Sequence, residues 1–333
     1  METTGIPAII TAGDLRASRE IGGQSKVYLE LAGLPLVAHV VATLQDVPEV
    51  SEVWVVGDAE RLEQALSDES FRAGLSKPLR IQSQFRSLYE NAWETYRRAL
   101  PGAPEAGTDP VGADLDRMAL FLSADLPFVT AQELSAFIRR SLSTGKDYLL
   151  GLVPESSLTP FYPRDSKPGI APAFFNIRDG RLRQSNLHLA RPGRMGKRQH
   201  IEDMYEHRHQ REWADMLGLA WRLLVSERAG LQVVYFFMLL HLAGLADRWR
   251  LRGLADRLRS PITLARVEGI ISRLLDTRFG FVLTEVGGSA IDVDTEAEYD
   301  AVRERFEEWR AVQAERAEQL YGPVRPDENT GAT

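Results

Sequence analysis

The chain contains no cysteine among its 333 residues. This absence excludes disulfide bonds and metal sites built from thiolate ligands. An excess of positive charge is also lacking, because 40 lysines and arginines stand against 47 aspartates and glutamates, for a formal net charge of -7. Binding to nucleic acid through its backbone needs a basic face, so we expect no nucleic-acid partner. No basic residue precedes the first apolar run, and that run is too short for a secretory signal, so we expect a cytoplasmic protein.

Two common phosphate-binding signatures are missing as well. The dinucleotide fingerprint G-x-G-x-x-G does not follow the first apolar run, where residues 12–18 read AGDLRAS. Residues 22–27, GGQSKV, have neither the spacing of a P-loop nor a hydroxyl residue after the lysine. The chain is otherwise 44% apolar and 26% charged, which is typical of a globular protein, and it is longer than one average domain.

The most informative stretch is residues 6–57. It begins with the apolar run Ile6 to Ile10, passes through a polar loop to Lys26, continues into a helix-like segment and ends with the apolar run Val53 to Val56. This order predicts a strand, a long loop, a helix and a second strand. Two such strands joined by a helix form a right-handed parallel unit, and ligands bind at the carboxyl edge of such units.

The same alternation continues along the chain. Capping residues at Asp58, Ser87, Thr130 and Thr295 predict the starts of four helices, the last three as capping boxes. Further strands are expected over 79–81, 118–122, 148–153, 173–177, 185–189, 279–285 and the acidic residues 291–294. The pattern predicts an α/β fold with a Rossmann-like, doubly wound, mostly parallel sheet.

Several of these residues occur in a familiar order: a glycine and an arginine after the first strand, Lys26, and the phrase LAGLPL at 31–36. The order resembles the nucleotidyltransferases of the MobA-like and sugar-phosphate type, whose pattern is roughly L-A-G-G-x-G-x-R, then P-K, then L-x-G-x-P-L. The resemblance covers residues 6 to about 153 and returns near 279–302. It departs at Asp14, which stands where the family has its second glycine. A carboxylate there would repel a triphosphate, so Asp14 must point away or the loop must take another path.

The resemblance implies an activity and a set of site residues. It implies that a nucleoside monophosphate moves from a nucleoside triphosphate to a small acceptor bearing a phosphate or hydroxyl, with Mg²⁺ as cofactor and pyrophosphate as product. Lys26 and Asp125 are the expected catalytic residues. The expected nucleotide-binding residues are Ala12, Gly13, Arg16, Gly23, Lys26, Ser87, Asn91 and Asp125, and the expected acceptor-binding residues are Ser185, Asn186 and Arg191. For Ser87 a purely capping role is the alternative.

The predicted metal ligands are aspartates remote from one another in the sequence. Asp125 follows a predicted strand, and Asp294, with Asp292 assisting, precedes the last predicted helix. Mg²⁺ takes oxygen ligands and is usually held by one or two carboxylates together with substrate phosphates. A noncatalytic nucleotide-binding or regulatory module is the alternative to an enzyme, and a dehydrogenase is a more distant one because its glycine fingerprint is missing.

A mostly helical insertion is predicted at 197–278, between core segments 1–196 and 279–321, and residues 322–333 are predicted to be a flexible tail. Within the insertion, residues 229–246 carry no charge, and arginines alternate with apolar residues from 248 to 259. The run is at the lower limit for a membrane span of about 20 residues. The alternatives are a buried hairpin or homodimer surface, peripheral contact of 229–259 with the inner face of a membrane, and a span.

Overall fold

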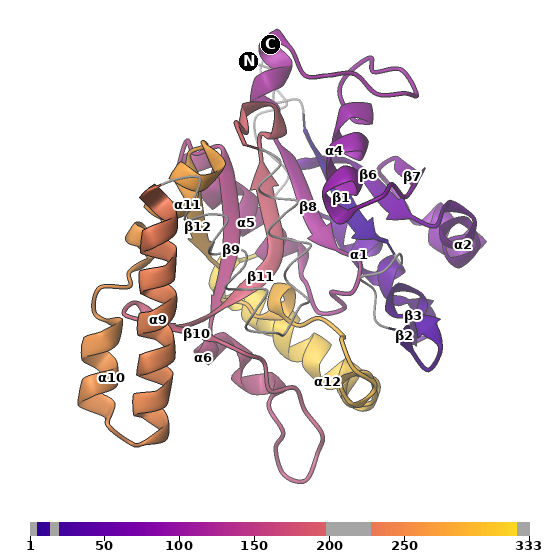
Figure 1. The fold of residues 1–333 in the computed structure, drawn as a ribbon. Coiled ribbons are helices and arrows are strands. Elements are labelled where there is room, and N and C mark those ends of the chain that lie inside the picture. The colour runs from indigo at the N-terminus through magenta and orange to yellow at the C-terminus, as the bar shows by residue number, and fades with distance from the viewer. Residues whose placement is uncertain (1–4, 14–19, 198–227, 325–333) are drawn as a thin grey trace.

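A computed structural model describes residues 5–13, 20–197 and 228–324 of the chain (Figure 1). Its centre is an eight-stranded sheet in the order β12-β9-β11-β8-β1-β6-β7, with β10 paired to β11. The strands are β1 (Ile6–Ala12), β6 (Val50–Gly57), β7 (Leu79–Ser83), β8 (Ala119–Ser123), β9 (Tyr148–Pro154), β10 (Phe175–Ile177), β11 (Gly180–Ala190) and β12 (Phe279–Leu283).

The sheet is mostly parallel, which confirms the predicted fold class. Strands β8, β1, β6 and β7 run parallel to one another, and β12 runs parallel to β9. The exception is β11, which lies between β8 and β9 and is antiparallel to both. Two short hairpins, β2 (Glu20–Ile21) with β3 (Gln24–Ser25) and β4 (Glu30–Leu31) with β5 (Leu34–Pro35), lie in the long loop after β1.

The helices begin where the capping residues predicted. Asp58, Ser87, Thr130 and Thr295 each accept a hydrogen bond from the backbone N–H three residues later. Each such cap stabilises its helix by about 1 kcal/mol. The helices are α1 (Leu36–Gln45), α2 (Ala59–Ala65), α3 (Glu69–Ala73), α4 (Leu88–Arg98), α5 (Ala131–Ser143), α6 (Glu155–Leu158), α9 (Arg228–Arg248), α10 (Arg252–Arg259), α11 (Leu264–Leu275) and α12 (Glu296–Tyr321).

Helices cover both faces of the sheet, because successive strand residues point to opposite sides. In β1, Ile10 belongs to the apolar cluster that includes Val41 of α1 and Phe137 of α5. The neighbouring Ile9 belongs to the cluster on the other face, with Tyr96 of α4. A third cluster joins Phe128 to α12, through ring contacts such as Phe128 with Trp309 at 5.5 Å. Both faces of the parallel strands are therefore buried, so a ligand can reach these strands only at the edges of the sheet.

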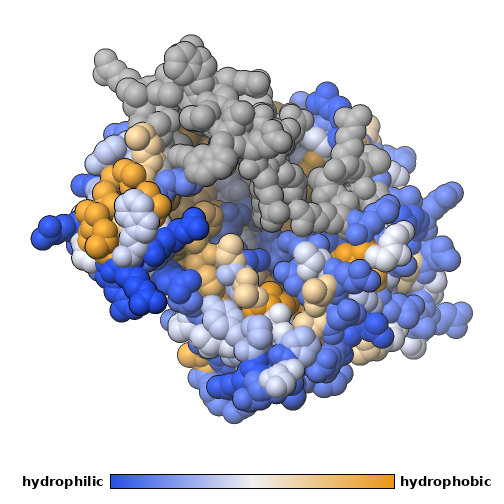
Figure 2. Space-filling view, turned by 60° about the horizontal axis from the view of Figure 1, so that its bottom comes forward, coloured by the Kyte–Doolittle hydropathy of each residue, from blue (hydrophilic) through white to orange (hydrophobic). Residues whose placement is uncertain are grey.

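Helices α9 and α10 form a hairpin at one side of the molecule (Figure 1). Part of α9 packs on the sheet, where Phe236 and Leu240 contact the cluster around Ile177. Another side of α9 is open, and its exposed apolar side chains follow one another at intervals of three and four residues: Tyr235, Met238, Leu242 and Leu245, with the exposed Trp249 directly after the helix. An apolar patch lies on the same side of the molecule in Figure 2. Within the described ranges, we find no helix with the length and apolar character that crossing a membrane requires.

One predicted strand is wrong. Residues 291–294 have an irregular backbone that follows a short 3₁₀ turn at Gly288–Ala290. The alternation of apolar and acidic residues in this segment has another cause. Ile291 and Val293 are fully buried in the cluster beside α12, and the aspartates point away from it. The domain boundaries stay predictions. Within the predicted insertion, residues 228–275 contain the three helices α9, α10 and α11, whereas 198–227 and the tail from 325 onward lie outside the described residues.

Candidate active site

Three carboxylates and one lysine meet at the carboxyl edge of the sheet. Asp125 follows β8 by two residues, Asp292 and Asp294 lie between β12 and α12, and Lys26 follows β3. One oxygen from each carboxylate lies within 4.8 Å of the others. The structure thus brings together four residues that the sequence analysis selected from three distant segments.

Lys26 lies between two of these carboxylates. Its Nζ is 2.5 Å from Asp125 Oδ2 and 2.6 Å from Asp294 Oδ1. Burial by itself would lower the pKa of Lys26, but the attraction of Asp125 and then of Asp294 outweighs it and raises the pKa above its ordinary value. Lys26 is therefore a permanent positive charge at neutral pH, as neutralising a phosphate requires.

The three carboxylates differ in their surroundings. Asp125 is buried, and the hydroxyl of Ser123 donates a hydrogen bond to its Oδ1. Asp292 accepts a hydrogen bond from Arg183 Nη2 at 2.7 Å. Burial, followed by the charges of Asp125 and Asp294, raises the pKa of Asp292, and Arg183 acts in the opposite direction. The side chain of Asp294 is 48% exposed, so the cluster opens to solvent on that side.

The cluster fits a divalent metal ion. Its donors are carboxylate oxygens, which are the ligands that Mg²⁺ prefers. Asp125 Oδ2 is buried, and the ammonium group of Lys26 lies 2.5 Å from it. A positive charge thus already lies against this oxygen, as a buried carboxylate oxygen requires. Asp125, Asp292 and Asp294 are therefore suited to hold a metal ion.

The residues expected to bind the nucleotide are partly at this edge. Ala12 ends β1, and the next residue, Gly13, lies so near Asn91 that a Cβ on Gly13 would be 3.0 Å from Asn91 Nδ2. The buried Asn91 also accepts a hydrogen bond from Phe85 N. Ser87 caps α4 by accepting from Glu90 N at 3.1 Å, which is the alternative role given for it above.

The backbone conformation explains why two glycines follow each other in the loop. Gly22 and Gly23, with φ of +61° and +77°, form the two-residue turn between β2 and β3. Positive φ at both positions strains any other residue. The predicted contact of Gly23 with a nucleotide stays a prediction. Asp14 and Arg16 lie outside the described residues.

Two of the three predicted acceptor-binding residues do not face this site. Ser185 is fully buried where β11 shifts its register against β9, and its hydroxyl packs on Gly151. Asn186 is better placed. Leu187 lies opposite Leu122 of β8, and because the pair is antiparallel, Asn186 comes next toward the carboxyl edge.

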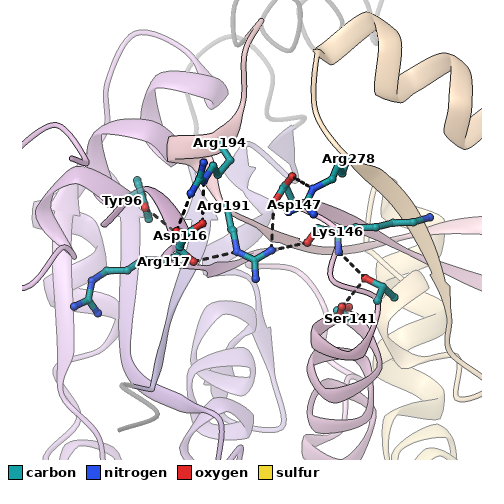
Figure 3. Close-up of polar contacts among 10 residues, drawn as sticks. Tyr96, Asp116, Arg117, Ser141, Lys146, Asp147, Arg191, Arg194 and Arg278 are labelled. Atoms are coloured by element: carbon teal, nitrogen blue, oxygen red, sulfur yellow. Dashed lines mark hydrogen bonds and ion pairs between the residues drawn. The ribbon is translucent and has the colours of Figure 1, made fainter. Parts of the chain in front are cut away.

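Arg191 is the clear correction, because it lies at the opposite edge of the sheet. Its Nη1 donates to Lys146 O at 2.7 Å and to Asp147 Oδ1 at 3.3 Å, and its Nε donates to Asp116 O at 3.0 Å (Figure 3). Asp116 and Asp147 precede β8 and β9, so this cluster is at the amino ends of the parallel strands. The antiparallel direction of β11 carries its last residues there, away from Asp125.

Arg183 is the residue that the sequence analysis missed. It lies near the start of β11, at the carboxyl edge, and its guanidinium reaches Asp292. The strand was predicted to begin at Ser185, and Arg183 lies before that position. The signal was available in the sequence, because Arg181 and Arg183 alternate with Leu182 as strand residues do.

A family model and a curated relative match parts of the chain. The family model described as MobA-like NTP transferase domain matches residues 8–171. A curated 2-C-methyl-D-erythritol 4-phosphate cytidylyltransferase of Chlorobium luteolum is 26% identical over 139 residues, which are 41% of this chain and 55% of the relative. The chain thus spans about half the length of that relative.

One solved structure supports the fold. A hypothetical transferase from Thermus thermophilus superposes with a TM-score of 0.56 at 20% identity, over 88% of this chain and 99% of the other. A 4-diphosphocytidyl-2C-methyl-D-erythritol synthase from Anaerococcus prevotii gives a TM-score of 0.46 at 14% identity, over 92% and 100%. The family model thus identifies residues 8–171 as a MobA-like NTP transferase domain, and the likeness to the Thermus thermophilus structure supports the fold alone.

Proposed function

We propose that this chain is a nucleotidyltransferase that moves a nucleoside monophosphate from a nucleoside triphosphate to a small acceptor and releases pyrophosphate, with Mg²⁺ as cofactor. The observation that carries the proposal is the meeting of Lys26 with Asp125, Asp292 and Asp294 at the ligand edge of a MobA-like domain. Segments that are distant in the sequence bring three carboxylates and one ammonium group together there, and the carboxylate of Asp125 is buried. Holding three carboxylates so close costs free energy that a bound cation offsets.

The reaction asks mainly for positioning and charge neutralisation. An acceptor oxygen attacks the α-phosphorus, a new P–O bond forms, and the bond from the α-phosphorus to the bridging oxygen breaks, so that pyrophosphate leaves in line. Lys26 contributes a fixed positive charge beside the carboxylates, which neutralises negative charge on the triphosphate. Mg²⁺ bound to the carboxylates would add positive charge at the α-phosphate.

The side chain of Arg183 indicates which chemical group the acceptor carries. In the described part of the chain it donates to Asp292 through a single nitrogen, and its side chain is 21% exposed. A guanidinium carries five donors in a planar fork that matches phosphate and carboxylate oxygens. We propose that Arg183 and Asn186 contact an acceptor with an anionic group near the attacking oxygen.

A noncatalytic nucleotide-binding module is the second candidate, because Asp14 departs from the family pattern in the loop. The three carboxylates argue against it. A module that only binds a nucleotide gains little from three negative charges beside a triphosphate, whereas metal-assisted transfer needs them.

The experiment is a thermal-shift panel with CTP, ATP, GTP and UTP, each with and without Mg²⁺. CTP comes first, because the curated relative is named a cytidylyltransferase. A ligand at about 100 times its dissociation constant stabilises a fold by roughly 2.7 kcal/mol, which such a panel detects. The panel is run on the wild type, on Asp125→Asn, and on Asp147→Asn as a matched control. Asp147 is a buried, ion-paired aspartate at the opposite edge of the sheet.

The expected result is a shift with one nucleotide that needs Mg²⁺, is lost in Asp125→Asn and persists in Asp147→Asn. Activity is then measured as the release of pyrophosphate from that nucleotide in the presence of phosphorylated and unphosphorylated acceptors. Binding without any release would favour the noncatalytic module. Absence of a shift with all four nucleotides would contradict both candidates.

Residues 229–259 stay the predicted contact surface for a membrane or for a second copy of the chain. Exposed apolar side chains of the α9 and α10 hairpin, such as Trp249 and Leu254, lie among arginines such as Arg250 and Arg252. Arginines beside apolar side chains suit an anionic lipid surface. Flotation with anionic vesicles tests the first partner, and the mass in solution without lipid tests the second.

A further inference from the structure

Glu133 does not complete the capping box that its sequence predicts. Thr130 Oγ1 accepts from Glu133 N at 3.2 Å, which is the first half of the box. The carboxyl group of Glu133 turns to a residue 156 positions away. It accepts from Ser289 N at 3.1 Å and from Ser289 Oγ at 2.6 Å. A helix-capping side chain has therefore become a link between α5 and the segment that leads to Asp292 and Asp294.

This link is made in the interior of the protein. Glu133 and Ser289 are both fully buried, and burial raises the pKa of Glu133 to about 8, against the hydrogen bonds from Ser289. A capping box at the surface would stabilise α5 without burying a carboxyl group. The stability of the helix alone therefore does not explain the position of Glu133.

Two further contacts fix the same segment. Gln313 of α12, which is also buried, accepts from Gly287 N at 2.9 Å. Gly288 lies directly on the backbone that follows Asp125: a Cβ on Gly288 would overlap Phe128 O and would be 2.8 Å from Val129 N. We call Gly287, Gly288 and Ser289, with the side chains of Glu133 and Gln313, the clasp.

The clasp lies between Asp125 on one side and Asp292 and Asp294 on the other. Ser289 is three residues before Asp292, a path of at most about 10 Å, and the residues between, Ala290 and Ile291, are fully buried. On the other side, Gly288 touches the segment three residues after Asp125. The position of Asp292 and Asp294 relative to Asp125 is thus determined by buried contacts outside the cluster itself.

We propose that Glu133 is a positioning residue that, with Gln313, sets the spacing of the three metal-binding carboxylates. The inference rests on the proposed function in so far as the carboxylates bind a metal ion. Residues that orient metal ligands without touching the metal typically change its affinity by about 10- to 100-fold when they are removed. A residue that only stabilises the fold changes the melting temperature and leaves metal affinity unchanged.

The test compares Glu133→Ala with Ser135→Ala. Ser135 is on the same helix and is also buried, but its hydroxyl donates to Glu49 Oε1 at 2.9 Å, away from the clasp. Binding of Mn²⁺ without nucleotide is measured by the loss of the free-ion electron paramagnetic resonance signal. Hydrogen exchange of residues 285–294 is measured by mass spectrometry in the same samples. Glu133→Gln is the rescue variant, because its amide can accept from Ser289 N and donate to Ser289 Oγ.

We expect Glu133→Ala to bind Mn²⁺ about 10- to 100-fold more weakly and to exchange faster in 285–294. Glu133→Gln should keep most of the wild-type affinity, and Ser135→Ala all of it. Wild-type affinity in Glu133→Ala, or an equal loss in Ser135→Ala, overturns the proposal. If Glu133→Ala does not fold, Ser289→Ala removes one hydrogen bond of the clasp and is judged in the same way.

Failure of the proposed function gives a different result. If the wild type binds Mn²⁺ neither without nucleotide, where Lys26 pairs with the carboxylates, nor with it, the metal centre is refuted, and the clasp is decided by exchange alone. Faster exchange confined to 285–294 in Glu133→Ala then supports a clasp that positions this segment. Unchanged exchange there overturns it.

Discussion

Lys26 Nζ lies 2.6 Å from Asp294 Oδ1, although 268 residues separate the two in the sequence. The same Nζ is 2.5 Å from Asp125 Oδ2, so one ammonium group joins the two segments that supply the carboxylates. Without a nucleotide, Lys26 therefore takes the place that a cation would take among these oxygens. The free protein reduces the repulsion within its acidic cluster with a residue of its own.

This competition predicts the behaviour of Lys26→Met. Without the ammonium group, Mn²⁺ should bind the nucleotide-free protein more tightly, by roughly tenfold or about 1.4 kcal/mol, because it no longer displaces an ion pair. The stabilisation by nucleotide with Mg²⁺ should fall in the same variant, because the triphosphate loses a counter-charge. Calorimetric titration with Mn²⁺ and the thermal-shift panel measure the two effects.

Lys146→Met is the matched control for this prediction. Lys146 Nζ forms an ion pair with Glu268 at 2.7 Å, outside the cluster. Its removal should change neither metal nor nucleotide binding. Equal Mn²⁺ affinity in Lys26→Met and the wild type would contradict the competition.

The buried Glu133 predicts a dependence of stability on pH. Its pKa is raised to about 8 in the folded protein, above the ordinary value of 4.5, so the folded state holds the proton more tightly than the unfolded chain. The stability that this proton contributes is complete below about pH 4.5 and is lost as the pH rises to about 8. The amide side chain that Glu133→Gln introduces does not titrate.

The free energy of unfolding of the wild type should therefore fall, relative to that of Glu133→Gln, between pH 5 and pH 8. The change should be on the order of a few kcal/mol. Urea unfolding of both proteins at four pH values in this window measures it. A constant difference between the two proteins across the window would show that Glu133 does not titrate there.

The position of Arg191 leads to a third prediction. Arg191→Met removes hydrogen bonds to Lys146 O, Asp147 Oδ1 and Asp116 O at the amino edge of the sheet. The free energy of unfolding should fall by about 1–3 kcal/mol, because the buried Asp147 and two backbone carbonyl groups lose a charged donor. Nucleotide and acceptor binding should not change. A lost nucleotide shift in this variant, at unchanged stability, would return Arg191 to the active site.

Much of the core could be predicted from the sequence, because local signals and tertiary contacts agree there. Ser87, Thr130 and Thr295 each begin a helix, and the apolar runs around Ile10 and Val55 each form a buried strand. These signals act over a few residues. The resemblance then placed Lys26 and the aspartates at one edge, which a pattern of residue types alone does not do.

The errors arise where a distant contact decides the structure. The direction of β11 cannot be read from its own residues, and its antiparallel direction places Arg191 at the amino edge and Arg183 at the carboxyl edge. The alternation in residues 291–294 imitates a strand because Ile291 and Val293 pack against α12. Glu133 satisfies the local capping rule in its backbone but gives its carboxyl group to Ser289, which no local pattern indicates.

Arg183 provides the last prediction, which concerns the acceptor. Arg183→Met should raise the KM for an anionic acceptor by about 10- to 100-fold, because a hydrogen bond to a charged group contributes about 1.5–3 kcal/mol. The KM for the nucleotide should change much less.

Arg181→Met is the control, since Arg181 is two residues away on the same strand and pairs with Glu155 instead. Pyrophosphate release at varied acceptor concentration measures both constants. An equal rise in KM for both variants would mean that β11 is a general electrostatic surface, and an unchanged KM for the anionic acceptor in Arg183→Met would remove the assigned role.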